Sequence, residues 1–155
     1  MTLKVRRGVT GHNENGKATV VIDEMSDNVI SRRAGQHSTV IWATDQTPAD
    51  LASVNDISAD VEATTVPNGT VFRISRFEPG VAPRNHRTAS LDYAVVMSGA
   101  IDMELDDGEI VNLKAGDVLV QRGTVHNWTN PGTEPCIIAF ILMAAPLPEE
   151  LNAEG

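Results

Sequence analysis

Six short runs of β-branched, aromatic and other apolar residues constrain the fold of this chain more than any other feature. Turn residues separate these runs, which lie at 18–23, 38–44, 69–77, 92–105, 118–123 and 135–143. Such residues favour strands because their side chains pack well on a pleated surface. Short strands at regular spacing predict an all-β sandwich or barrel.

Two dipeptides between the runs are typical of tight hairpin turns. Asn15-Gly16 and Asp107-Gly108 tolerate the positive φ angles that such turns demand. One weak helical pattern lies at 47–56, where we expect a single turn capped by Thr47.

The length of 155 residues suits one domain with room for a core or a small cavity. We expect a single domain over 1–155. Its parts are N-terminal strands and a loop at 1–66, a barrel core at 69–143, and an acidic tail at 146–155 that frays.

The composition argues against several classes of partner. Twelve basic and 21 acidic residues give a formal net charge of -9, which disfavours nucleic acid and anionic membranes as partners. The N-terminus has no long apolar segment, and no run reaches the length of a membrane span. We therefore expect a cytoplasmic protein.

Cys136 is the only cysteine, so the chain cannot form an internal disulfide. It lies in the apolar stretch PCIIAFILMAA, where no neighbouring group would lower the pKa of its thiol. We expect a buried structural thiol rather than a nucleophile.

Two spaced motifs point to a functional site. The first runs Gly80, five residues, His86, one residue, Thr88, three residues, Asp92, six residues and Gly99. The second is the stretch GDVLVQRGTVHNWTN, in which His126 follows Gly123 by three residues and Asn130 follows four residues later.

The pair of motifs resembles the two conserved motifs of the cupin superfamily, G-x5-H-x-H-x3,4-E-x6-G and G-x5-P-x-G-x2-H-x3-N. The resemblance covers about residues 69–143 and implies a double-stranded β-helix barrel. It also implies that His86, Asp92 and His126 are the ligand positions. Thr88 replaces the second histidine, Asp92 replaces glutamate, and the proline that usually precedes Gly123 is absent.

Strand geometry agrees with this assignment. Side chains alternate across a strand, so His86 shares a face with Thr88, and His126 shares one with Trp128. A bend after Thr88 can bring Asp92 beside them. If the barrel closes, these five residues line one cavity for a small-molecule substrate, with Thr88 and Trp128 as substrate-binding residues.

The same residues support two kinds of chemistry. His86, Asp92 and His126 are enough to hold one divalent ion such as Zn, Fe, Mn or Ni with open positions. Without a metal, a carboxylate that orients an imidazole gives a general acid or base near neutral pH, which suits dehydration, isomerisation or decarboxylation. A pocket that only binds a ligand is the third alternative.

Arginines on the run at 69–77 are candidates for a substrate carboxylate, because a guanidinium can bind one bidentately. Arg73 and Arg76 point to opposite faces of their strand, so at most one of them enters the barrel. Arg76 shares parity with Phe72 and Ile74, and we predict that it points inward.

Within the cupins, HRTASLDY together with GDVLVQRGTVHNW resembles small single-domain proteins of secondary metabolism. The resemblance implies an enzyme acting on a small organic molecule, such as an aromatic or carbonyl compound, and a homodimer formed by N-terminal strand exchange or sheet packing. A lyase or isomerase of the dehydratase or decarboxylase type is our first expectation. A metal-dependent oxidoreductase or dioxygenase and a non-catalytic ligand-binding protein are the alternatives.

Overall fold

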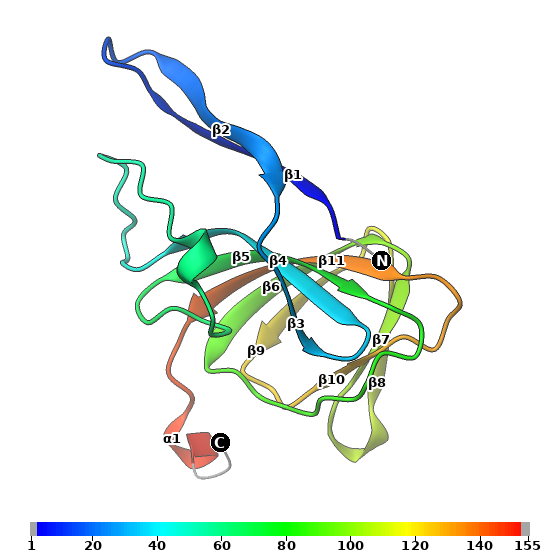
Figure 1. The fold of residues 1–155 in the computed structure, drawn as a ribbon. Coiled ribbons are helices and arrows are strands. Elements are labelled where there is room, and N and C mark those ends of the chain that lie inside the picture. The colour runs from blue at the N-terminus through cyan, green and yellow to red at the C-terminus, as the bar shows by residue number, and fades with distance from the viewer. Residues whose placement is uncertain (1–2, 153–155) are drawn as a thin grey trace.

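The computed structural model describes residues 3–152 and shows a β-barrel with a projecting hairpin (Figure 1). A six-stranded sheet in the order β3-β4-β5-β11-β6-β9 faces a three-stranded sheet in the order β10-β7-β8. The strands are β1 (Val5–His12), β2 (Ala18–Ser26), β3 (Val29–Arg33), β4 (Gln36–Thr44), β5 (Thr70–Phe77), β6 (Ser90–Ser98), β7 (Ala100–Glu104), β8 (Ile110–Lys114), β9 (Val118–Arg122), β10 (Asn127–Thr129) and β11 (Cys136–Ala144). The predicted all-β class is confirmed.

Glycines with positive φ make the corners of the barrel. Gly16 (φ 71°) lies in the turn between β1 and β2, and Asp107 (φ 57°) and Gly108 (φ 76°) lie between β7 and β8, as predicted. Gly99 (φ 76°) divides the predicted run 92–105 into two strands that belong to different sheets. A Cβ atom at Gly99 would lie 2.3 Å from the carbonyl oxygen of Pro135, so only glycine fits this corner.

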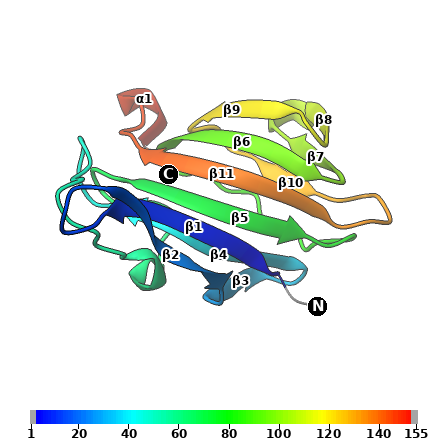
Figure 2. The ribbon, with the colours of Figure 1, turned by 90° about the horizontal axis from the view of Figure 1, so that it is seen from above.

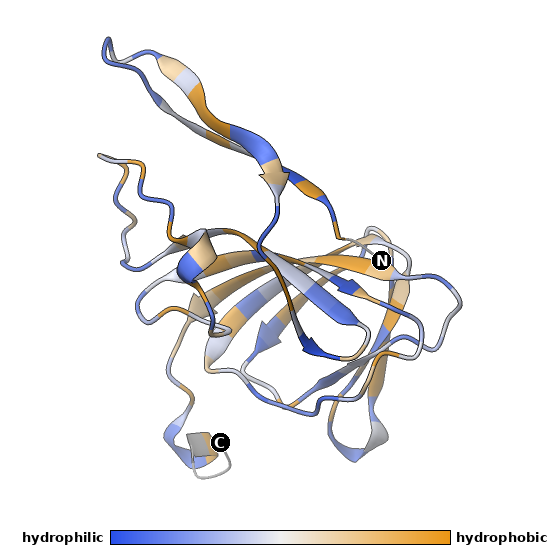
Figure 3. Cartoon of the chain, in the orientation of Figure 1, coloured by the Kyte–Doolittle hydropathy of each residue, from blue (hydrophilic) through white to orange (hydrophobic). Residues whose placement is uncertain are grey.

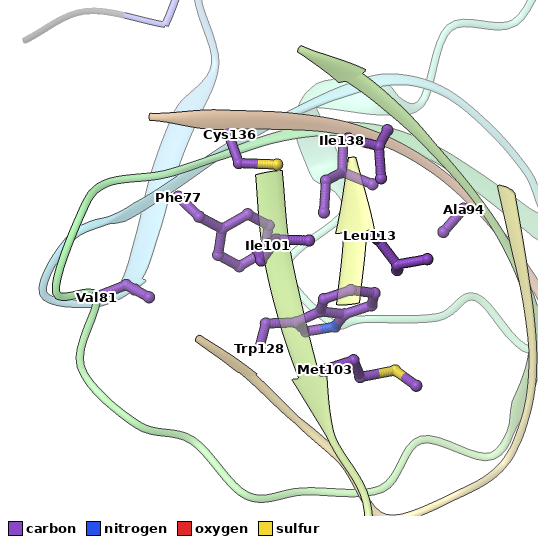
Figure 4. Close-up of a cluster of buried hydrophobic side chains, with 10 residues drawn as sticks. Phe77, Val81, Ala94, Ile101, Met103, Leu113, Trp128, Cys136 and Ile138 are labelled. Carbon is purple, nitrogen blue, oxygen red and sulfur yellow. The ribbon is translucent and has the colours of Figure 1, made fainter. Parts of the chain in front are cut away.

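The two sheets enclose an aromatic and aliphatic core (Figure 4). Trp128 packs against both Phe77 and Phe140, with ring centroids 6.2 and 5.6 Å away, and these two rings also contact each other. Cys136 is fully buried, and burial raises the pKa of its thiol to about 11. The thiol is therefore protonated at neutral pH and packs as a small apolar group, as predicted.

The β1–β2 hairpin passes over the outer side of β4 and β5 and then projects beyond the barrel (Figures 1 and 2). Arg7 of β1 is buried and anchors the hairpin. Its guanidinium forms ion pairs of 2.6 Å with both Glu24 and Asp56 and donates a hydrogen bond to the carbonyl oxygen of Ile41. Arg7 thus joins the hairpin, the loop after β4 and β4 itself.

The helical turn predicted within 47–56 does not form. Leu51 is 91% exposed and Val54 is 50% exposed, so no core contact stabilises a helical face there. A 3₁₀ turn, η1 (Ser58–Asp60), follows instead, and a second one, η2 (Asp106–Gly108), lies after β7.

The predicted frayed tail contains a short helix, α1 (Glu149–Asn152), and its last three residues lie outside the described part of the chain. None of the helices within residues 3–152 is long and apolar enough to span a membrane.

Candidate active site

Two histidines face each other at one end of the barrel. His86 and His126 exchange backbone hydrogen bonds of 3.0 and 2.9 Å and form an isolated antiparallel bridge. Residues directly opposite in such a bridge project their side chains to the same side. The two imidazole centroids are therefore only 4.5 Å apart.

Backbone carbonyls fix the tautomer of both rings. The Nδ1 atom of His86 lies 3.0 Å from the carbonyl oxygen of Arg84, and that of His126 lies 2.8 Å from the carbonyl oxygen of Thr124. A carbonyl only accepts, so each Nδ1 carries the proton and each Nε2 is left as an acceptor. Burial lowers the pKa of both imidazoles, that of His86 to about 4, so both are neutral at pH 7.

A carboxylate and an amide extend this pair. The Nε2 atom of Gln121 donates to Asp92 Oδ2 at 3.1 Å and lies 3.2 Å from the Nε2 atom of His126. Ser90 donates its hydroxyl hydrogen to the other carboxylate oxygen of Asp92. Burial raises the pKa of Asp92, and the hydrogen bonds from Ser90 and Gln121 oppose this effect.

The sequence analysis missed Gln121. In the second cupin motif a proline stands two residues before the glycine, and in this chain Gln121 takes that position before Gly123. The missing proline was the signal that could have identified Gln121.

The rings border a cavity of about 70 Å³ inside the barrel. Five of the six residues predicted for the site line it together, and they are His86, Thr88, Asp92, His126 and Trp128. Their chemical roles stay predictions. Phe77, Phe140 and Leu142 supply the apolar part of its wall.

The inward orientation predicted for Arg76 is wrong. Arg76 lies on the outer face of β5 and pairs with Glu78 at 2.6 Å, whereas Arg73 lines the cavity and is 6% exposed. The parity argument failed because Ile74 is buried on the outside of the sheet beneath Leu3, rather than inside the barrel.

Three further arginines line the cavity. Arg32 and Arg33 belong to β3, and Arg84 precedes His86 on the loop after β5. A terminal nitrogen of Arg84 lies 3.5 Å from the Nε2 atom of His86. Arg32 and Arg33 were not predicted for the site, because only strand pairing places β3 at the end of the six-stranded sheet, beside the cavity.

The predicted ligands do not form a three-residue metal site. Across residues 3–152, no three His, Cys, Asp or Glu side chains gather closely enough to hold an ion. Thr88 occupies the position of one imidazole, and both carboxylate oxygens of Asp92 accept hydrogen bonds from neighbouring side chains. The donor set therefore does not fit a divalent ion in the predicted triad.

Comparison with known proteins agrees with the motifs. The model of the cupin domain family matches residues 73–142. A cupin-domain-containing oxidoreductase of Aspergillus ruber is 37% identical over 149 residues, covering 90% of this chain and 72% of that protein. Phomopsin biosynthesis cluster protein C' of Diaporthe leptostromiformis is 39% identical over 133 residues, covering 80% of this chain and 69% of that protein.

The fold of a solved structure agrees as well. An RmlC-like cupin from Shewanella frigidimarina superimposes with a TM-score of 0.51 at 15% identity, covering 81% of this chain and 88% of that one. The motifs, the barrel and the relatives lead to one conclusion: this chain belongs to the cupin family.

Proposed function

We propose that this cupin is an enzyme that moves a proton on a small organic molecule, in the manner of an isomerase or a dehydratase. The observation that carries the proposal is the pair of neutral imidazoles, 4.5 Å apart, whose acceptor nitrogens border one cavity. The similarity to a cupin-domain-containing oxidoreductase and to a protein of a biosynthesis cluster supports an enzyme of secondary metabolism.

His86 is our candidate for the general base. Within the described residues, its Nε2 atom has one long polar contact, 3.5 Å to Arg84, whereas the Nε2 atom of His126 lies 3.2 Å from the Gln121 amide. A neutral imidazole can remove a proton from a carbon next to a carbonyl group. The imidazolium that forms then returns the proton to a neighbouring carbon, or to a hydroxyl group that leaves as water.

Asp92 and Gln121 would act on His126 as positioning residues. Asp92 orients the Gln121 amide, and the amide in turn holds the ring of His126 against His86. This chain of contacts needs no additional group to complete the proton transfer.

An oxidoreductase is the second candidate, because several relatives carry that name. Oxidation requires an electron acceptor, such as a redox-active divalent ion with oxygen. The side chains described above do not supply a three-residue ligand set for that ion, so we derive no step through it.

One experiment separates the two candidates. The protein is incubated in D₂O with a panel of small 2-oxo and 3-hydroxy carbonyl compounds, and mass spectrometry follows deuterium uptake while an electrode follows oxygen. Proton transfer predicts deuterium uptake that is lost in His86→Asn and kept in His12→Asn, which changes an exposed histidine of the hairpin. Oxygen consumption that requires added iron or manganese, without deuterium exchange, would overturn the proposal in favour of the oxidoreductase.

We also propose a homodimer as the working form. The outer face of the six-stranded sheet carries a row of exposed apolar residues that lie opposite one another on four adjacent strands, namely Phe72, Ile141, Tyr93 and Val120. Val20 and Met25 of the projecting hairpin are exposed, and Figure 3 shows hydrophobic stretches along this hairpin. In a twofold-symmetric dimer, the sheet face and the hairpin of one copy would each be covered by the same surface of the second copy.

A further inference from the structure

The cavity is basic although the chain as a whole is acidic. Four of the 12 basic residues line it, whereas Asp92 is the only carboxylate in its wall, in a chain with a net charge of -9. Clustered positive charge inside low-dielectric walls attracts anions.

Among the residues that the structure describes, none of the four arginines forms an ion pair with a carboxylate. The ion pairs within residues 3–152 all involve other arginines, namely Arg6, Arg7 and Arg76. The cavity arginines instead contact backbone carbonyls and neutral side chains. Arg73 donates to the carbonyl oxygen of Ala63, and Arg32 to that of Glu62. Asp92, whose charge acts on Arg73, therefore offsets only part of the positive charge of the four arginines.

Two donors in this group lack any acceptor. The Nε atoms of Arg73 and Arg32 are buried and, within the described part of the chain, have no hydrogen-bond partner. An unsatisfied buried donor is costly, and the cost is higher when the group is charged. Such atoms in a cavity wall indicate that a ligand supplies the missing acceptor.

We propose that the substrate is a small organic acid whose carboxylate binds Arg73, with Arg32 and Arg84 nearby. This proposal rests on the proposed function and names its substrate class. A guanidinium matches a planar carboxylate with two parallel hydrogen bonds. The cavity of about 70 Å³ is smaller than the roughly 150 Å³ that admits benzene. The cavity thus accepts the carboxylate end of the substrate, and its apolar wall residues contact the carbon chain of the substrate.

Arg84 lies close enough to His86 to place a bound carboxylate beside the general base. Because a terminal nitrogen of Arg84 lies 3.5 Å from the Nε2 atom of His86, a carboxylate held by this arginine places its neighbouring carbon beside the base. The guanidinium also stabilises negative charge that develops on the carboxylate side when that carbon loses a proton.

The test is calorimetric titration of the protein with malonate, succinate and benzoate, each compared with its uncharged amide and with inorganic phosphate. We expect at least one acid to bind and its amide not to bind. Arg73→Met should weaken acid binding by roughly tenfold to hundredfold. Arg76→Met is the matched control, because it removes an arginine from the opposite face of the same strand, and it should leave the affinity unchanged.

The proposal would be overturned by equal affinity for an acid and its amide, by no detectable binding of any acid at millimolar concentration, or by unchanged binding in Arg73→Met. Preferential binding of phosphate would also overturn the assignment to carboxylates. If Arg73→Met does not fold, Arg84→Met on the half-buried loop replaces it, with the same expected loss. If His86→Asn is inactive but still binds the acid, the proposed carboxylate site stands independently of the proton-transfer mechanism.

Discussion

Replacing Arg73 with methionine is expected to make the protein more stable, although the variant removes a buried residue of the candidate site. Arg73 is 6% exposed and has no ion pair with any carboxylate in residues 3–152. The nearby Asp92 offsets its buried charge only in part, so the charge opposes folding. Methionine keeps most of the volume of the arginine stem and removes the charge.

The structure gives the size of this effect. Burial, together with the charges of Arg32 and Arg84, lowers the pKa of Arg73 to about 10. The shift from its ordinary value corresponds to about 3 kcal/mol that the charged form costs the folded state. The variant loses one hydrogen bond to the carbonyl oxygen of Ala63, worth about 1.5 kcal/mol. The net gain in unfolding free energy is about 1–2 kcal/mol, or a rise in Tm of roughly 2–8 °C.

The sign of the pH dependence follows from the direction of the shift. The pKa of Arg73 is lower in the folded state than in the unfolded state. The buried charge therefore destabilises the fold fully below the folded pKa, and this destabilisation disappears as the pH rises from the folded towards the unfolded pKa. The stability difference between Arg73→Met and the wild type should therefore be constant between about pH 6 and 9.

Thermal unfolding followed by circular dichroism measures the effect, with and without succinate. Arg73→Met should unfold at a higher temperature, and succinate should stabilise only the wild type. A variant that unfolds several degrees below the wild type would refute the reasoning, because Arg73 would then stabilise the fold rather than wait for a ligand.

Two further predictions concern the hairpin and the outer sheet. Arg7 lowers the pKa of Asp56 to about 2, so the ion pair stabilises the fold above the ordinary carboxyl pKa and this contribution is lost as the pH falls through about 2. Asp56→Asn should therefore cost about 1–2 kcal/mol at pH 7 in urea unfolding, and the difference should vanish in strong acid. Val120→Glu, which places a charge in the exposed apolar row, should convert the proposed dimer to a monomer in light scattering, whereas an unchanged mass would exclude this face as the interface.

The strands that the sequence predicted have dense β-branched runs. Most of the strands it missed are polar or very short, although β8 (Ile110–Lys114), an apolar strand of five residues, was also missed. β1 (Val5–His12) and β3 (Val29–Arg33) carry arginines and glycine, and β10 (Asn127–Thr129) has three residues. Their pairing comes from neighbouring strands rather than from their own propensity, so a local pattern could not reveal them.

The motif spacing located the histidine pair, but strand parity alone misplaced the arginine. β5 has apolar residues on both faces, because the N-terminal segment covers one face and the barrel interior buries the other. A strand buried on both sides gives no clean alternation, and the choice between Arg73 and Arg76 then depends on tertiary packing that no local pattern contains.

Two positions at which this chain departs from the cupin motifs, Asp92 and Gln121, are in contact with each other. One amide nitrogen lies 3.1 Å from Asp92 Oδ2 and 3.2 Å from the Nε2 atom of His126, so it donates between the two groups that a cation would join. Gln121→Ala frees both acceptors. We expect this variant to bind Ni²⁺ or Zn²⁺ roughly tenfold more tightly than the wild type in calorimetric titrations, and His126→Ala added to it should remove the gain. Equal metal affinity in Gln121→Ala and the wild type would show that the amide does not compete with a cation, and that Thr88 alone sets the ligand count.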